Sequence, residues 1–190
     1  MIEIQIDDEA MSMLEKTVAD RMKFKKKYVP NAGKRQRKLM LSKTDTDKQV
    51  KLRGLSGEYA LSKYLDIPLT HSLRHSTGSD RGFDFAVNGT TIEMKTTRTP
   101  LLIINKDYRR LKGDIAVDAE EISPNRILLR GWVTREDFYE RCYDKEYRGK
   151  DANGCRMRDV MNPIDLNPID TLKEYLDARK DPQVGEPEVP

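Results

Sequence analysis

The chain of 190 residues lacks the features that place a protein in a membrane or in an oxidising compartment. No apolar run approaches the roughly 20 residues that a membrane-spanning helix needs. The two cysteines, Cys142 and Cys155, have neither the number nor the spacing of a zinc site or a redox pair, and two ordinary thiols fit a reducing cytoplasm. The first residues lack the basic start and apolar stretch of a secretory signal. We therefore expect a cytoplasmic protein that makes no membrane contact.

Histidine is equally scarce, which limits the metal centres that ring nitrogens could form. His71 and His75 stand four residues apart, but the proline, serines and glycine around them disfavour a stable helix. No set of acids or cysteines accompanies them, so we do not expect a zinc site. Residues 68–81 are instead predicted to form a loop that leads into the next strand, where Arg74 and Arg81 are candidates for phosphate contact.

The net charge is only +3, but it is distributed unevenly along the chain. Between Arg21 and Arg53 there are 13 lysines and arginines and 2 aspartates, a local charge of +11, which leaves −8 for all other residues. Segregation of this size predicts an electrostatic arm for a polyanion such as DNA. A solvated face or a disordered arm is the plainer alternative, although solvated faces usually mix both signs. The residues that we assign to nucleic-acid binding in this arm are Lys25, Lys26, Lys27, Lys34, Arg35, Arg37 and Lys38.

The most informative stretch is residues 82–97, where Asn88-Gly89 separates two runs rich in aromatic and β-branched residues. Asn-Gly in this setting is the strongest short-range signal for a two-residue hairpin turn. Such a turn fixes the register, so Asp84 should lie opposite Glu93. Side chains alternate across a strand. One face then carries the apolar residues Phe83, Phe85, Val87, Ile92 and Met94, and the other carries Asp84, Ala86, Thr91, Glu93 and Lys95.

The polar face of this hairpin places like charges together. Residues directly opposite each other have Cβ atoms about 5 Å apart, and like charges there destabilise a sheet. A divalent cation would give Asp84 and Glu93 a reason to face each other, because Mg²⁺ commonly takes one or two carboxylates together with water and phosphate oxygens. Lys95 points the same way and can neutralise charge or orient a water molecule. The plainer interpretation is an exposed polar face with a Glu93–Lys95 pair.

A helix is predicted upstream of the hairpin, over residues 52–65, with Ser56 as a candidate N-cap. On a helical wheel Glu58 lies with Leu55 and Leu61, inside the apolar stripe. A carboxylate in that position needs a partner or a metal. The alternative is a glutamate that the dipole favours near a helix N-terminus. We favour the site, because the two hairpin carboxylates need a third ligand or a residue that holds water.

Together, these residues resemble the PD-(D/E)XK nuclease superfamily. The positions that carry the resemblance are Asp84, Glu93 and Lys95 on the hairpin and Glu58 in the upstream Gly-Glu-Tyr-Ala segment. The resemblance spans roughly residues 54–140, and Phe83 stands where the family motif has proline. It implies a restriction-endonuclease-like fold, an α/β architecture in which a mixed central β-sheet is flanked by helices. Here the core would carry a basic N-terminal helical extension.

The resemblance also implies hydrolysis of DNA phosphodiester bonds with Mg²⁺ or Mn²⁺, one or two ions per site. Asp84 would be the central metal ligand and Glu93 the second. The main-chain carbonyl of Met94 would add a third, and Glu58 would hold a metal-bound water or a second ion. Lys95 would orient the attacking water and offset phosphate charge. The residues after the motif that could donate to phosphate oxygens are Thr96, Thr97 and Arg98.

The rest of the chain is expected to surround this hairpin. Strands are predicted at residues 2–6, 101–104, 114–117 and 126–133, and helices at residues 8–27, 135–142 and 170–179. This order suits an α/β core. We expect an N-terminal helix and basic arm in residues 1–53, the nuclease core in 54–142, a C-terminal extension packed on the core in 143–180 and a disordered tail in 181–190. The charged residues 143–162 show no clear periodicity.

The function that these features predict is a Mg²⁺-dependent nuclease, an endonuclease of DNA processing, repair, recombination or phage-type DNA metabolism. A non-catalytic nucleic-acid-binding protein that retains the fold is the alternative, and an adaptor whose basic arm binds an acidic protein is a third class. Salt-sensitive DNA binding separates the first two from the third, and metal-dependent cleavage separates the first from the second. Paired cuts on two strands would need two sites, which makes a homodimer attractive.

Overall fold

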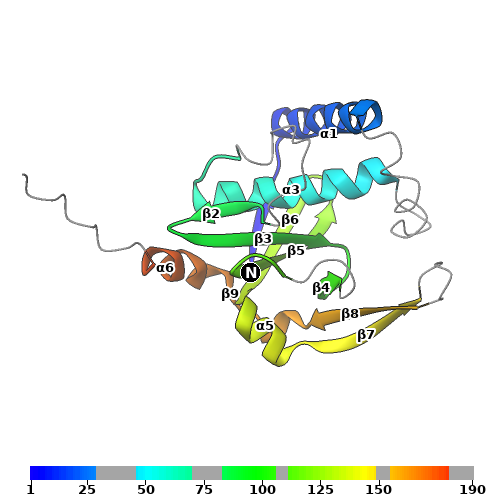
Figure 1. Cartoon of the computed structure of the whole chain (residues 1–190). Coiled ribbons are helices and arrows are strands. Elements are labelled where there is room, and N and C mark those ends of the chain that lie inside the picture. The colour runs from blue at the N-terminus through cyan, green and yellow to red at the C-terminus, as the bar shows by residue number, and fades with distance from the viewer. Residues whose placement is uncertain (29–45, 70–82, 106–110, 149–154, 180–190) are drawn as a thin grey trace, which may run out of the picture.

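The computed structural model describes residues 1–28, 46–69, 83–105, 111–148 and 155–179. These residues form a mixed α/β fold in which two β-sheets and their helices surround two hydrophobic cores (Figure 1). The α/β class is therefore as predicted. No helix in these ranges is long and apolar enough to cross a membrane.

The larger sheet is mixed, as predicted. Its strands are β1 (Ile2–Gln5), β2 (Phe85–Val87), β3 (Thr90–Thr97), β5 (Ile115–Ser123), β6 (Arg126–Thr134) and β9 (Asn167–Pro168). The strand order is β1-β6-β5-β3-β2, and β9 pairs with β6. β3 and β5 are parallel, whereas the other pairs are antiparallel. A parallel pair needs a crossover connection, and the chain makes it by way of a second sheet.

Two helices, α1 (Asp8–Tyr28) and α3 (Asp47–Leu65), cover one face of the larger sheet, with α1 stacked on α3 (Figure 1). α1 occupies the predicted residues. It starts after Asp7, whose carboxylate accepts a hydrogen bond from the main-chain N–H of Ala10 at 2.7 Å.

The start of α3 differs from the prediction. The N-cap is Thr46, which forms a capping box with Gln49, and the predicted cap Ser56 is buried in the helix interior. The capping box offers two reciprocal hydrogen bonds, so it sets the start in a stretch that has little apolar periodicity. α3 also crosses residue 53, where we had placed the boundary between arm and core. Glu58 therefore lies in the middle of α3, and a helix-terminal dipole does not explain it.

The other face of the larger sheet meets a smaller sheet and the short helix α5 (Figure 1). The strands of this sheet are β4 (Leu102–Asn105), β7 (Tyr143–Arg148) and β8 (Cys155–Met161), in the antiparallel order β4-β8-β7. The helix α5 spans Arg135–Arg141. The strand predicted at 101–104 thus belongs to a separate sheet, and the described parts of the charged stretch 143–162 include two antiparallel strands, β7 and β8. Main-chain pairing defines these strands, and a hydrophobic pattern does not report them.

The chain then returns to the larger sheet through three short elements. These are the 3₁₀ turns η1 (Pro163–Asp165) and η2 (Ile169–Thr171) and the helix α6 (Leu172–Asp177), which falls within the predicted helix 170–179. The ring of Tyr175 in α6 lies 4.3 Å from that of Trp132 in β6, centroid to centroid. The indole N–H donates to the hydroxyl of Thr171 at 3.0 Å.

Alternation along β3 and β5 divides the side chains between the two cores. Val117 packs in the core under α1 and α3, whereas Ala116 packs in the core toward the smaller sheet. Met94 belongs to the first core. Glu93, which pairs in register with Ala116, therefore lies on the face toward the smaller sheet, as does Lys95.

β5 is longer than its predicted range, 114–117, because charged residues do not end it. The strand continues to Ser123 through Asp118, Glu120 and Glu121. Each of these carboxylates has an arginine partner in the fold. A charged residue in a strand is tolerated when its partner lies beside it, and that partner is invisible in the local sequence.

Candidate functional site

The predicted hairpin turn forms. Asn88 and Gly89 both have positive φ angles, 49° and 76°, as a type I′ turn requires. The register is as predicted, with Phe85 opposite Ile92. The side-chain amide of Asn88 donates to the carbonyl oxygen of Leu176 at 3.0 Å, which ties the tip of the hairpin to α6.

The β2–β3 ladder ends at Phe85, so Asp84 does not continue the strand pairing as we predicted. Its main-chain N–H donates to the carbonyl of Ile92 at 2.8 Å, and its carboxylate accepts a hydrogen bond from the Met94 N–H at 2.7 Å. The side chain thus takes the place of the next strand residue beside β3. Since the N–H and C=O of one strand residue point to the same side, the Met94 carbonyl faces the same edge as Asp84.

Glu93 is buried, with 6% of its surface exposed. One carboxylate oxygen forms an ion pair with the ammonium of Lys95, and the other accepts a hydrogen bond from the main-chain N–H of Lys112 at 3.0 Å. The Lys95 side chain keeps 25% of its surface exposed. The Glu93–Lys95 pair of the plainer interpretation is therefore present, but Glu93 is not exposed as that interpretation expects.

The donor set suits a cation held by two carboxylates. Asp84 directly precedes β2 and Glu93 lies in β3, and the Asp84 carboxylate contacts the main chain of Met94, the residue next to Glu93. Mg²⁺ is commonly held by one or two carboxylates and completes its shell with water and substrate oxygens. Among the described residues, no three Asp, Glu, His or Cys side chains are grouped closely enough to hold a metal. The half-buried Glu58 belongs to α3, which packs on the face of β3 opposite to Glu93. The roles of Glu58 and of the Met94 carbonyl in metal binding remain predictions.

The three residues after the motif diverge. The hydroxyl oxygen of Thr96 is buried under α3, where a Cβ atom on Gly57 would come within 1.7 Å of it, and it has no hydrogen-bond partner. Thr97 points to the other face and donates to the carbonyl of Thr99 at 2.8 Å. Arg98 is 46% exposed. These residues do not form one phosphate-binding surface with the hairpin carboxylates.

Arg98 shares a carboxylate with a second arginine. Glu121, at the end of β5, accepts from Arg98 at 2.5 Å and from Arg53 of α3 at 2.6 Å. Glu121 and Arg53 are almost fully buried, whereas Arg98 is half-exposed. Arg53 was counted in the basic arm, and the structure places it in the packed layer between α3 and the sheet.

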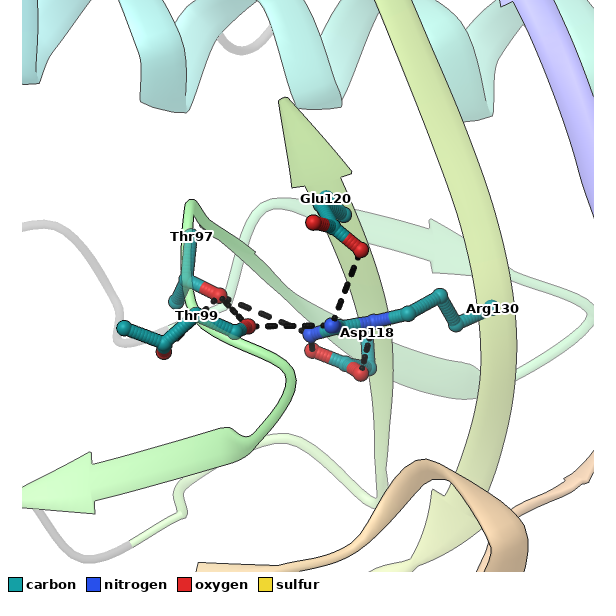
Figure 2. A network of polar contacts seen from close by, with 5 residues as sticks. All are labelled: Thr97, Thr99, Asp118, Glu120 and Arg130. Carbon is teal, nitrogen blue, oxygen red and sulfur yellow. Dashed lines mark hydrogen bonds and ion pairs between the residues drawn. The ribbon is translucent and has the colours of Figure 1, made fainter. Parts of the chain in front are cut away.

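A buried ion pair lies beside the motif, and sequence reasoning missed it (Figure 2). The guanidinium of Arg130 binds both carboxylate oxygens of Asp118, at 2.7 and 2.9 Å, and the two side chains are 3% and 0% exposed. Arg130 also donates to the carbonyl of Thr99 at 2.9 Å and reaches Glu120 at 3.4 Å. It thereby fastens the turn that follows β3 to β5 and β6.

A β-bulge directs Arg130 toward its partner. Asp118 pairs with Gly131 and Ala119 with Leu129, so Arg130 is the extra residue on β6. The one signal in the sequence that pointed to this buried pair was an arginine within an otherwise apolar strand. Burial raises the pKa of the Asp118 carboxyl to about 6, and the hydrogen bonds from Arg130 act in the opposite direction.

Most of the basic residues assigned to nucleic-acid binding lie outside the described residues. These are Lys34, Arg35, Arg37, Lys38, Arg74 and Arg81. Lys25, Lys26 and Lys27 belong to the last turns of α1, and their side chains are not described. The tail 181–190 is also outside the described ranges. The basic arm thus remains a prediction.

Replacing Thr96 with valine should stabilise the fold and leave DNA binding unchanged. Valine has the shape of threonine and removes a buried hydroxyl that has no partner, so we expect a gain of about 1 kcal/mol in the free energy of unfolding. Urea denaturation followed by the fluorescence of Trp132, the single tryptophan, measures stability, and fluorescence anisotropy measures DNA affinity. Weaker DNA binding by Thr96→Val would instead assign the hydroxyl to phosphate contact.

Comparison with known proteins finds no relative of the chain. No protein-family model matches the chain, and neither the curated proteins nor the solved structures compared with it give a match. The resemblance to PD-(D/E)XK nucleases rests on the motif residues of the sequence alone.

Proposed function

We propose that the chain is a metal-dependent nuclease that hydrolyses DNA phosphodiester bonds at a site formed by Asp84, Glu93 and Lys95. The observation that carries the proposal is the arrangement of these side chains. Asp84 is bound to the main chain between the other two residues, and the buried Glu93 is paired with Lys95. Two carboxylates can hold a divalent cation, and the ammonium beside them can offset phosphate charge, which supports metal-dependent hydrolysis of a phosphodiester.

Each of these residues has a distinct task in the proposed reaction. Asp84 and Glu93 would hold a divalent cation, which would neutralise phosphate charge and favour the ionised form of an attacking water. Lys95 lies next to Glu93 and is partly exposed, so its ammonium can hold that water in place and offset charge on the phosphate. The basic segment before α3 would supply affinity that does not depend on sequence.

One observation favours a second candidate. Both carboxylate oxygens of Glu93 have a partner in the protein, Lys95 for one and the Lys112 N–H for the other. A buried carboxylate with such partners needs no metal for its stability. A nucleic-acid-binding protein without cleavage activity would also be consistent with this contact.

Cleavage of a panel of linear, nicked, supercoiled and branched DNAs tests the two candidates. We expect products with Mg²⁺ or Mn²⁺, little product with Ca²⁺, whose coordination geometry is looser, and none in EDTA. Salt-sensitive binding without cleavage of any substrate would support the non-catalytic candidate. Absence of both binding and cleavage would point to an adaptor with an acidic protein partner.

A further inference from the structure

A short segment outside the motif contacts Glu93 directly. The main-chain N–H of Lys112 donates to one carboxylate oxygen of Glu93 at 3.0 Å, and Lys95 pairs with the other oxygen. The Lys95 ammonium sits on a flexible, partly exposed chain, whereas a main-chain donor is fixed by the path of the backbone. The orientation of the Glu93 carboxylate therefore depends on where the chain runs at Lys112.

Gly113 brings that backbone close enough to make the contact. A Cβ atom at this position would lie 2.9 Å from the main-chain nitrogen of Glu93 and 3.2 Å from its Cβ. It would also lie 2.9 Å from the carbonyl oxygen of Ile115. Two of these three neighbours are backbone atoms, which cannot move aside as a flexible side chain does. The approach to Glu93 thus needs glycine at residue 113.

Two side chains of α5 form hydrogen bonds with the main chain of the segment that contains Lys112. The main-chain N–H of Leu111 donates to the hydroxyl of Tyr139 at 2.7 Å. The guanidinium of Arg135 donates to the carbonyl of Lys112 at 3.2 Å. The Leu111 N–H and the Lys112 carbonyl, which lie on either side of the peptide unit that carries the Lys112 N–H, are therefore attached to one helix, and this limits the freedom of that N–H to rotate.

The end of the segment is attached to β3 itself. The carboxylate of Asp114 accepts hydrogen bonds from the hydroxyl of Thr91 at 2.7 Å and from its main-chain N–H at 2.9 Å. These bonds, the hydroxyl first, lower the pKa of Asp114 below its usual value. Asp114 is thus ionised at neutral pH and fixes the spacing between the segment and the strand that carries Glu93.

We propose that residues 111–114 are a positioning element of the nuclease site, in which the Lys112 N–H sets the orientation of Glu93 and Gly113 sets its distance from the backbone. This inference rests on the proposed function, because it makes Glu93 a metal ligand that must be held in one geometry. Groups that orient a metal ligand commonly change metal affinity or activity by about 10–100-fold when they are removed.

A matched pair of variants at residue 112 tests the hydrogen bond. Lys112→Pro removes the N–H, whereas Lys112→Ala keeps it and measures the contribution of the side chain alone. We expect Lys112→Pro to weaken Mn²⁺ binding, measured by calorimetric titration of the full chain without DNA, by about 10–100-fold more than Lys112→Ala does. Single-turnover cleavage should show the same difference in the Mg²⁺ concentration for half-maximal rate.

A second pair keeps the test valid if proline at residue 112 prevents folding. Gly113→Ala should weaken Mn²⁺ binding by a similar factor, because the added Cβ displaces the segment from Glu93. Gly54→Ala in α3 is its control, since no atom lies within 4 Å of the added Cβ. Unchanged Mn²⁺ binding in Gly113→Ala, or equal effects of the two Lys112 variants, would overturn the positioning role while the nuclease proposal stands. A wild-type chain that binds no Mn²⁺ and cleaves no DNA would overturn both.

Discussion

Asp84→Asn is expected to fold as the wild type does and to abolish cleavage. The hydrogen bond from the Met94 N–H to Asp84, 2.7 Å long, can be kept by the side-chain oxygen of asparagine. The change therefore preserves the contact beside β3. It replaces a charged metal ligand with a neutral, weaker one, so the loss falls on metal binding and not on the fold.

Charge explains why this loss should be large. Two carboxylates and one ammonium leave the site of Asp84, Glu93 and Lys95 with one net negative charge, and a phosphodiester brings another. A divalent cation reverses the sign of the site, so metal binding and productive substrate binding are coupled. Asp84→Asn weakens binding of the cation, and with it the productive binding of substrate that depends on the cation. DNA binding in EDTA should not fall, because the substitution removes one negative charge near the phosphate.

In the same experiment, Lys95→Ala distinguishes the role of the cation from the role of the attacking water. Lys95 pairs with Glu93 but is assigned to the water, so its variant should lose cleavage while metal binding is largely kept. Single-turnover cleavage, calorimetric metal titration and thermal melts of both variants provide the comparison. Wild-type rates in Asp84→Asn, or full activity of the wild type in EDTA, would leave the assignment of the site without support.

The hairpin could be predicted because the chemistry that defines it is local. Asn88 and Gly89 adopt positive φ angles that few other residue pairs accept, and the turn then fixes the strand register. The burial of Phe85 and Ile92 and their pairing follow from that register. The sequence therefore predicted which residues surround the candidate site and that Glu93 and Lys95 share one face.

The long-range contacts around the candidate site could not be predicted in the same way. The Lys112 N–H and the Asp118–Arg130 pair act across 19 and 12 residues of sequence, and each depends on how strands meet in the fold. The bulge that directs Arg130 inward leaves no periodic pattern. The helical wheel put Glu58 inside the apolar stripe of α3, but the side of β3 on which that helix packs is a tertiary property.

Among the ion pairs of the described residues, the Asp118–Arg130 pair should be the most sensitive to a single substitution. Arg130→Met would leave the fully buried Asp118 without its guanidinium, and breaking a buried pair in this way costs about 3–5 kcal/mol of unfolding free energy. Arg126→Met on the same strand is the matched control. Arg126 pairs with Glu3 in solvent, where both side chains are 45% exposed, so its loss should change stability little.

A second substitution distinguishes the lost pair from lost packing. Replacing both partners, as in Asp118→Leu with Arg130→Met, removes the unpaired charge and should recover part of the stability that Arg130→Met alone loses. Urea denaturation followed at Trp132, which is 5% exposed and lies in the same strand as Arg130, measures the wild type and all three variants. A double variant that is less stable than Arg130→Met would assign the loss to packing and to the contact with Thr99.

The loss of stability in Arg130→Met should depend on pH, and the raised pKa of Asp118 fixes the sign. Burial raises this pKa to about 6 in the folded chain, from about 4 in the unfolded chain. Folding therefore favours the protonated carboxyl, and this contribution is full below pH of about 4 and is lost as the pH rises through 6. Without the hydrogen bonds and charge of Arg130, which lower the pKa, the carboxyl should titrate still higher. The difference between wild type and Arg130→Met should then be larger in urea titrations at pH 8 than at pH 4.5, and equal differences would show that Asp118 is not the residue left unpaired.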